Sequence, residues 1–233
     1  MKKYIAEFIG TAVLVIVGCG TAMLVGCDAV NGGGYILTAL AFGLAIVAMA
    51  YSVGNISGCH INPAVSLAVL IAGGMDKKDF VPYVIAQILG AFLGTGILAL
   101  IFKTGSITDM TGGYGANGLA GVGGSAISGL IVEIVLTFIF VMAILGVTSK
   151  RAKHGSFGGL VIALTLTLVH ILGIGLTGTS VNPARSIAPA VVAAISGNGD
   201  PVAALWVFIV GPLVGAALAA VVYKGLEGAK KTK

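Results

Sequence analysis

Six long apolar runs constrain the fold of this chain more than any other feature of its sequence. They cover residues of about 4–25, 35–54, 80–103, 125–148, 157–176 and 202–224. Each run approaches the roughly 20 residues that a helix needs to cross a hydrocarbon layer about 30 Å thick. Only 9% of the residues are charged, whereas a soluble domain carries about 25%. The sequence therefore predicts an all-α membrane protein with six transmembrane helices and excludes a water-soluble globule.

Two further apolar stretches, at about 62–73 and 182–196, are too short to cross the bilayer. A helix of twelve residues rises about 18 Å, which is roughly half the membrane thickness. Each stretch begins with Asn-Pro-Ala. Asn is a strong N-cap, and Pro at the first helical position sacrifices no hydrogen bond. We expect two re-entrant half-helices that start at these motifs.

The basic residues predict the orientation of the chain. Eleven of the 13 Lys and Arg residues fall on one side of a six-span arrangement. They are Lys2, Lys3, Lys77, Lys78, Lys150, Arg151, Lys153, Lys224, Lys230, Lys231 and Lys233. Cytoplasmic loops carry such an excess, so both termini should be cytoplasmic and the protein should be multi-pass in the cell membrane. Because these residues are spread over short connections, they indicate no nucleic-acid partner.

The chain repeats itself. Residues 57–66 (SGCHINPAVS) align with residues 177–186 (TGTSVNPARS), with five of ten positions identical, and Glu7 in the first span corresponds to Glu133 in the fourth. Each half, at about 4–103 and 125–224, holds three spans, so the second half enters the membrane from the opposite side. Ala86, Gly90 and Gly94 correspond to Gly211, Gly215 and Ala219, and the spacings Gly90-x-x-x-Gly94 and Gly211-x-x-x-Gly215 favour close helix packing. We predict a single domain over residues 1–233 with an inverted repeat.

The two half-helices should meet with their N-termini near the membrane midplane. Each N-terminus carries about half a positive charge, which repels cations and protons. Asn62 and Asn182 can cap with the side-chain oxygen while the amide donates into the lumen. Non-helical backbone at 57–61 and 177–181 is tolerated where it lines a water-filled cavity, with its carbonyls free to accept. These features favour a pore for small neutral solutes.

The chain resembles the aquaporins over essentially its whole length, through Ser57-Gly58-Cys59-His60-Ile61-Asn62-Pro63-Ala64-Val65 and Thr177-Gly178-Thr179-Ser180-Val181-Asn182-Pro183-Ala184-Arg185. It is most similar to their prokaryotic water-channel branch. The resemblance implies an aquaporin-like fold of six helices and two half-helices, with a pore in each subunit of a homotetramer embedded in membrane lipids. Water is the implied permeant, and the pore motifs are Asn62, Pro63, Ala64, Asn182, Pro183 and Ala184.

The resemblance also implies a selectivity filter built from four positions. These match Phe42, His170, Thr179 and Arg185. Glycerol-conducting relatives typically have Gly in place of His170 and Asp after Arg185, where this chain has Ser186. We therefore expect a constriction about one water wide, with the polar donors of His170 and Arg185 on one side and the Phe42 ring on the other.

Other polar residues near the motifs should line the pore or support its loops. The resemblance assigns Glu7 and Glu133 to bracing the loop backbones, although Glu7 lies near enough to the interface for simple solvation. Gly178 and Ser180 belong to the second loop. His60 either lines the inner vestibule, which the resemblance favours, or packs behind the loop. We hypothesise that Cys59 faces the cytoplasmic half of the pore and that mercurials block through it.

Of three other functions, two are compatible with parts of this pattern. A secondary transporter can also use an inverted repeat with broken helices, but it would ordinarily need carboxylates at the midplane, where only Glu133 is a candidate. An enzyme or a metal site finds no support, since His60, His154 and His170 lie in separate elements without ligand spacing. We expect no cofactor and no metal. A broader facilitator for glycerol, other small neutral solutes or gases is the main rival to a water channel.

Overall fold

A computed structural model describes residues 1–27, 33–149, 151–152 and 155–228. Six residues with predictions from the sequence lie outside these ranges. The sequence predicts a cytoplasmic position for Lys150, Lys153, Lys230, Lys231 and Lys233, and no metal role for His154. The elements are α1 (Lys2–Val25), α2 (Gly33–Ser57), α3 (Pro63–Ala72), α4 (Lys77–Thr104), η1 (Ala120–Val122), α5 (Ala126–Thr148), η2 (Gly155–Phe157), α6 (Gly158–Thr177), α7 (Pro183–Ile195) and α8 (Asp200–Gly228). Within the described residues every regular element is a helix.

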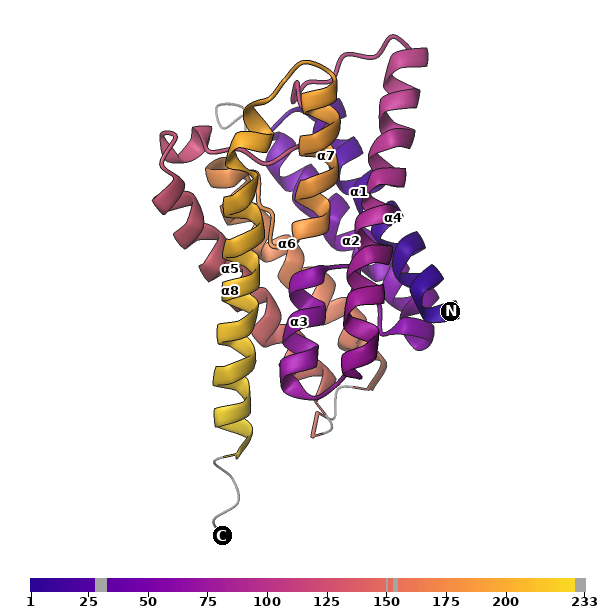
Figure 1. Cartoon of the computed structure of the whole chain (residues 1–233), viewed down its shortest axis with the longest axis vertical. Coiled ribbons are helices and arrows are strands. Elements are labelled where there is room, and N and C mark those ends of the chain that lie inside the picture. Colours follow the sequence, from indigo (N-terminus) through magenta and orange to yellow (C-terminus); the bar gives the residue numbers. More distant parts are fainter. Residues whose placement is uncertain (28–32, 150, 153–154, 229–233) are drawn as a thin grey trace.

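Six of these helices are long and apolar enough to cross a bilayer, which confirms the predicted spans. The two shorter helices, α3 and α7, begin at the Asn-Pro-Ala motifs, also as predicted. Figure 1 shows α7 above α3 in the middle of the molecule, with the long helices around them. The α3–α4 connection lies at the bottom of this view, and the α4–α5 and α7–α8 connections lie at the top.

The repeat is visible in the packing of the helices. Helix α1 packs on α4, and α5 packs on α8, which are equivalent pairs of the two halves. A methyl group added at Gly90 would overlap the Phe8 carbonyl of α1, and one added at Gly215 would overlap the Ile134 carbonyl of α5. Glycine is therefore required at both crossings because the backbones themselves are in contact, which confirms the predicted close packing.

Large apolar side chains cover the outer surface of the helices. Leu44 of α2, Leu100 of α4 and Ile127 of α5 are each more than half exposed, as are Leu168 of α6 and Val221 of α8. A water-soluble protein rarely exposes so much contiguous apolar surface, whereas lipid covers it favourably. The polar groups instead lie inside the bundle, around the ends of α3 and α7.

Candidate functional site: a pore between two half-helices

Each half-helix is capped by the Asn of its motif. The Asn62 Oδ1 atom accepts from the backbone N–H of Ala64 at 2.8 Å, and Asn182 Oδ1 accepts from Ala184 N at 3.0 Å. Both Asn residues have extended backbone, with φ of −161° and −153°. Pro follows at the first helical position, where no N–H is needed. The local sequence thus sets where both helices begin.

The two caps also bind each other's loops. Asn62 Nδ2 donates to the Val181 carbonyl at 2.7 Å, and Asn182 Nδ2 donates to the Ile61 carbonyl at 2.9 Å. We expected these amides to donate into the lumen, but the structure engages one N–H of each in this reciprocal contact. An amide nitrogen has two hydrogens, so the second N–H of each Asn is left for a permeant molecule.

The loops that precede the half-helices have an unusual backbone. Cys59 and Ile61 have φ of 51° and 42°, and their repeat counterparts Thr179 and Val181 both have φ of 46°. Each non-glycine residue in this left-handed region costs roughly 1–2 kcal/mol. Such strain persists only where surrounding groups hold it in place.

Glu7 holds the first loop in this conformation. It is fully buried and accepts from His60 N at 2.9 Å, Ser57 Oγ at 2.7 Å and Gln87 Nε2 at 2.8 Å. It also accepts from the N–H of Ile61 at 2.5 Å. This burial leaves no room for the interfacial solvation that the sequence alone allowed.

Glu133 holds the second loop in the same way. It is also fully buried, and it accepts from Thr177 Oγ1 at 2.7 Å, Ser180 N at 3.0 Å and Val181 N at 2.8 Å. A buried carboxylate is tolerated only where hydrogen bonds replace its water. Both oxygens are used behind the loop, so the carboxylate does not point at a permeant.

Fewer loop carbonyls are free than we expected. The Ser57 carbonyl accepts from Tyr83 OH at 2.8 Å, and the Thr177 carbonyl accepts from Asn117 Nδ2 at 3.1 Å. The Gly178 carbonyl accepts from Arg185 Nη2 at 3.3 Å. The two Asn amides bind the Val181 and Ile61 carbonyls as well. Among the described residues, only the carbonyls of 58–60 and 179–180 in these loops are therefore left without a donor.

A narrow cavity of about 20 Å³ lies at the meeting point of the half-helices. Its lining residues are Leu14, Phe42, Ile46, His60, Ile61, Asn62, Phe140, Leu166, His170, Ser180, Val181, Asn182 and Arg185. A cavity needs about 10–15 Å³ to hold one water molecule. The passage is therefore of single-water size. A wider hollow of about 750 Å³ lies on the other side of Arg185 and includes Tyr35 and Thr38.

Most of the cavity wall follows the inverted repeat. Counted from Glu7 and Glu133, Leu14 of α1 is equivalent to Phe140 of α5. Counted from the Asn pair, Ile46 is likewise equivalent to Leu166. Three lining residues depart from the repeat. The positions of Phe42, His170 and Arg185 are occupied in the other half by residues of a different kind, Ile162, Ala50 and Val65. The polar and aromatic end of the passage is thus a departure from the repeat.

Phe42 and His170 contact each other at this end. Their ring centroids are 4.4 Å apart with an interplanar angle of 27°, and the Arg185 Cζ atom lies 5.2 Å from the Phe42 centroid. We expected Phe42 to face His170 across a gap one water wide. In the structure the two rings are stacked, because both are buried side chains that gain contact area by closing on each other.

Two polar atoms near the stacked rings have no partner among the described residues. They are His170 Nε2 and Arg185 Nε, both buried. His170 Nδ1 lies 2.9 Å from the Leu166 carbonyl. Because a carbonyl oxygen can only accept, Nδ1 carries the proton and donates this hydrogen bond. The neutral ring then presents Nε2 as an acceptor. A buried unpaired polar atom is costly, so these two atoms mark a place for a polar guest.

Arg185 is held by a loop that sequence reasoning did not connect to the site. Its Nη1 atom donates to the Gly115 carbonyl at 2.9 Å and to Asn117 Oδ1 at 2.8 Å. Asn117 also accepts from Ser186 Oγ at 2.7 Å. Asn117 is 3% exposed. The available signal was a lone Asn in the Gly-rich stretch 112–124.

The remaining residues of the second loop lie beside the passage. Gly178 has φ of 73° and ends α6, which glycine permits at no steric cost. Ser180 lines the cavity, and its Oγ is 2.6 Å from Ser186 Oγ. The Thr179 side chain packs against Gly173 of α6 and is not among the cavity-lining groups.

The remaining residues of the first loop differ in their access to the passage. His60 lines the cavity, its Nδ1 lies 3.1 Å from Ser66 Oγ, and its ring packs at 5.2 Å from the Tyr83 ring. Cys59 is half-buried and is not among the cavity-lining residues. The two predicted alternatives, lining the pore and packing behind the loop, thus each describe part of the surroundings of His60.

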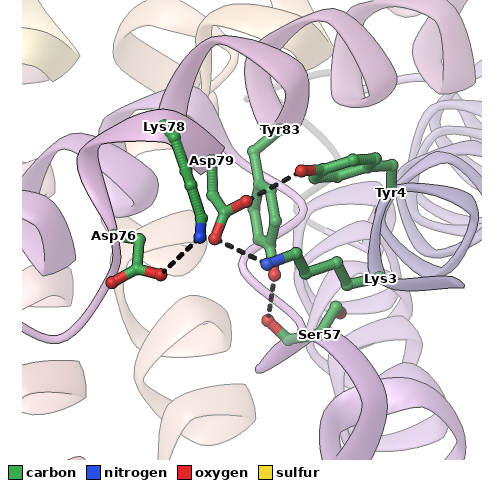
Figure 2. A network of polar contacts seen from close by, with 7 residues as sticks. All are labelled: Lys3, Tyr4, Ser57, Asp76, Lys78, Asp79 and Tyr83. Carbon is green, nitrogen blue, oxygen red and sulfur yellow. Dashed lines mark hydrogen bonds and ion pairs between the residues drawn. The ribbon is translucent and has the colours of Figure 1, made fainter. Parts of the chain in front are cut away.

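A polar network ties the first loop to the start of α4, as Figure 2 shows. Tyr4 OH donates to Asp79 Oδ1 at 2.8 Å, and Lys3 pairs with the other oxygen of Asp79. Tyr83, one turn further along α4, donates to the Ser57 carbonyl at 2.8 Å. Helix α4 therefore fixes both the N-terminus of α1 and the beginning of the loop.

The chain is similar to known proteins over nearly its whole length. The family model of the major intrinsic proteins matches residues 1–223. A protein named Aquaporin Z from Brucella melitensis biotype 1 is 45% identical over 231 residues, covering 98% of this chain and 99% of that protein. Aquaporin Z of Bradyrhizobium diazoefficiens is 42% identical over 230 residues, covering 97% and 94%.

Among solved structures, the aquaglyceroporin from Plasmodium falciparum matches with a TM-score of 0.85 and 25% identity, covering 97% of this chain and 96% of that one. The whole-chain family match, the close bacterial relatives and the shared fold agree with the paired half-helices described above. This chain belongs to the major intrinsic protein family.

Proposed function

We propose that this protein is a passive water channel driven by osmotic gradients. The observation that carries the proposal is the single-water cavity between the two Asn caps and Arg185. The passage offers hydrogen-bonding groups in single file and apolar walls between them, which suits a small neutral molecule. The water-channel relatives at 40–45% identity support the same function.

Exclusion of ions and protons follows from the charges around the passage. Both half-helix N-termini meet at its centre, and each carries about half a positive charge. Arg185 adds a full charge at one end. Glu7 and Glu133 use their oxygens behind the loops, so neither compensates this field in the lumen. The same placement weighs against a secondary transporter, which needs a carboxylate that meets its coupling ion.

We further propose that Phe42, His170, Thr179 and Arg185 form the selectivity filter. Contact between the Phe42 and His170 rings supports a filter that opens only slightly and rejects glycerol. Thr179 would contribute through its backbone carbonyl, since its side chain packs on α6. The second candidate is a broader facilitator, because an aquaglyceroporin shares the fold. A small residue in place of His170 would favour that function.

The assembly and its orientation are part of the proposal. We infer a homotetramer with one pore in each subunit, surrounded by membrane lipids, in the cell membrane. The exposed apolar side chains along all six long helices support both lipid and subunit contacts. The N-terminal ends of α1 and α4 carry Lys2, Lys3, Lys77 and Lys78. We assign these ends to the cytoplasm because cytoplasmic loops carry an excess of Lys and Arg. We assign no enzymatic activity, cofactor or metal, and no nucleic-acid partner.

Stopped-flow light scattering on proteoliposomes tests the function. An impermeant osmolyte should shrink the vesicles much faster than protein-free vesicles, and glycerol entry should stay at the protein-free rate. A pH-sensitive dye inside the vesicles should report no added proton leak. Water flux at the protein-free rate would overturn the proposal, and rapid glycerol entry would favour the broader facilitator.

A further inference from the structure

The Phe42 ring occupies space that a missing side chain on α1 leaves open. A Cβ atom at Gly18 would overlap three carbon atoms of the ring, Cδ1, Cε1 and Cζ. Phe42 is 1% exposed, so its ring has no solvent into which it could swing. Gly18 itself is not among the residues that line the passage or the wider hollow.

Other neighbours of the same ring belong to the constriction. The His170 ring is stacked against it at 4.4 Å, and Arg185 Cζ lies 5.2 Å from its centroid. Protein interiors are packed so densely that an added methyl group forces its neighbours to shift. A side chain at Gly18 would therefore press the Phe42 ring against the groups that define the narrowest part of the pore.

The second repeat shows the alternative arrangement of the same two positions. Gly18 is equivalent to Ile144, and Phe42 is equivalent to Ile162. The first repeat thus combines the smallest residue with a large ring, whereas the second has two residues of intermediate size. The pairing of a glycine with Phe42 is what allows an aromatic ring at one end of an otherwise repeated passage.

We propose that Gly18 is a positioning residue that sets the width of the constriction by providing the space for the Phe42 ring. This inference rests on the proposed water channel and its filter. Gly18 does not touch a permeating molecule, and it acts only through Phe42. Any side chain at position 18 narrows the pore, and truncation of Phe42 removes the effect.

The test compares Gly18→Ala, Phe42→Ala and the double variant in proteoliposomes, with water permeability expressed per inserted channel. Gly18→Ala should lower the permeability about tenfold, which is the effect of a barrier raised by an energy typical of overpacking. The double variant should conduct at the Phe42→Ala level, because the overlapping ring is gone. Because permeability is expressed per inserted channel, a role of Gly18 in insertion alone would leave this readout unchanged in Gly18→Ala.

Gly20→Ala is the matched control on the same helix. Its added methyl group meets the end of the flexible Leu98 side chain, at 2.8 Å, and no filter residue. This variant should retain wild-type water permeability. If Gly18→Ala does not insert, the double variant should still insert and conduct, because relief of the overlap restores packing.

The outcomes separate this inference from the proposed function. A conducting wild type with an equally permeable Gly18→Ala variant overturns the inference alone. So does a double variant that stays as impaired as Gly18→Ala. A wild type without water flux overturns the channel proposal and the inference together.

Discussion

The side-chain amide of Asn62 donates a 2.7 Å hydrogen bond to the backbone carbonyl of Val181, 119 positions away in the sequence. Asn182 returns the contact through the Ile61 carbonyl at 2.9 Å. Each cap therefore fixes the loop of the other repeat as well as its own helix. The two halves of the pore are joined at the point where a permeant must pass between them.

Replacement of Asn62 by Asp should weaken this junction. The carboxylate still caps α3, but it faces the Val181 carbonyl without a proton to donate. An unsatisfied buried pair of this kind costs about 1–3 kcal/mol. We expect a lower unfolding temperature in detergent. Asn55→Asp, at an exposed position near the end of α2, is the control and should leave the unfolding temperature unchanged; equal stability of both variants would contradict the role of the contact.

Glu133→Gln should loosen the second loop. The amide can accept through one oxygen only, and its NH₂ group confronts the N–H of Ser180 or Val181. Hydrogen bonds to a charged group contribute roughly 1.5–3 kcal/mol each, so both stability and water permeability should fall. Asp200→Asn, exposed in the first turn of α8, serves as the comparison. Normal water flux in Glu133→Gln would show that the loop keeps its shape without the carboxylate.

Asn117→Ala should release Arg185 on one side. The variant removes the 2.8 Å acceptor of Arg185 Nη1 and the partner of Ser186 Oγ. We expect altered water permeability and a measurable loss of solute selectivity in the same liposome assay, because the guanidinium is no longer fixed. Asn198→Ala removes a contact to Gly112 in the same loop and should have little effect. Identical permeabilities for both variants would exclude a positioning role for Asn117.

His170→Gly should widen the constriction. It removes the ring that stacks on Phe42, so glycerol entry should rise well above the protein-free rate while water still passes. Ile171→Gly places the same helix-weakening residue, at a cost of about 1 kcal/mol, one position away on the exposed face of α6. Glycerol exclusion that survives in His170→Gly would remove His170 from the filter.

Mercurial block should depend on Cys59. This thiol lies in the first loop at the repeat position of Thr179. The next residue, His60, lines the passage, so we expect a bulky adduct on Cys59 to distort it. Cys59→Ser should therefore abolish inhibition of water flux by mercury. Cys27→Ser tests the other accessible thiol, which borders the wider hollow on the Arg185 side. Block that persists in Cys59→Ser and disappears in Cys27→Ser would reassign the reactive site.

The sequence by itself determined the features that depend on local composition and spacing. Hydropathy over about 20 residues predicts a membrane span wherever it occurs, and the six long helices follow it. Asn-Pro sets the start of α3 and α7 because the cap involves only the next few residues. The inverted repeat was also readable, since Glu7 and Glu133 and the two Asn-Pro-Ala motifs lie at matching positions of the two halves.

Only the tertiary structure decided which groups meet across the pore. The reciprocal Asn amides, the stacked rings of Phe42 and His170, and the support of Arg185 by Asn117 join segments that are remote in the sequence. The space at Gly18 that admits Phe42 is of the same kind. Such contacts depend on how closely two helices approach and how their side chains fill the gap. Side-chain packing is decided by the whole bundle, and no local pattern in the chain encodes it.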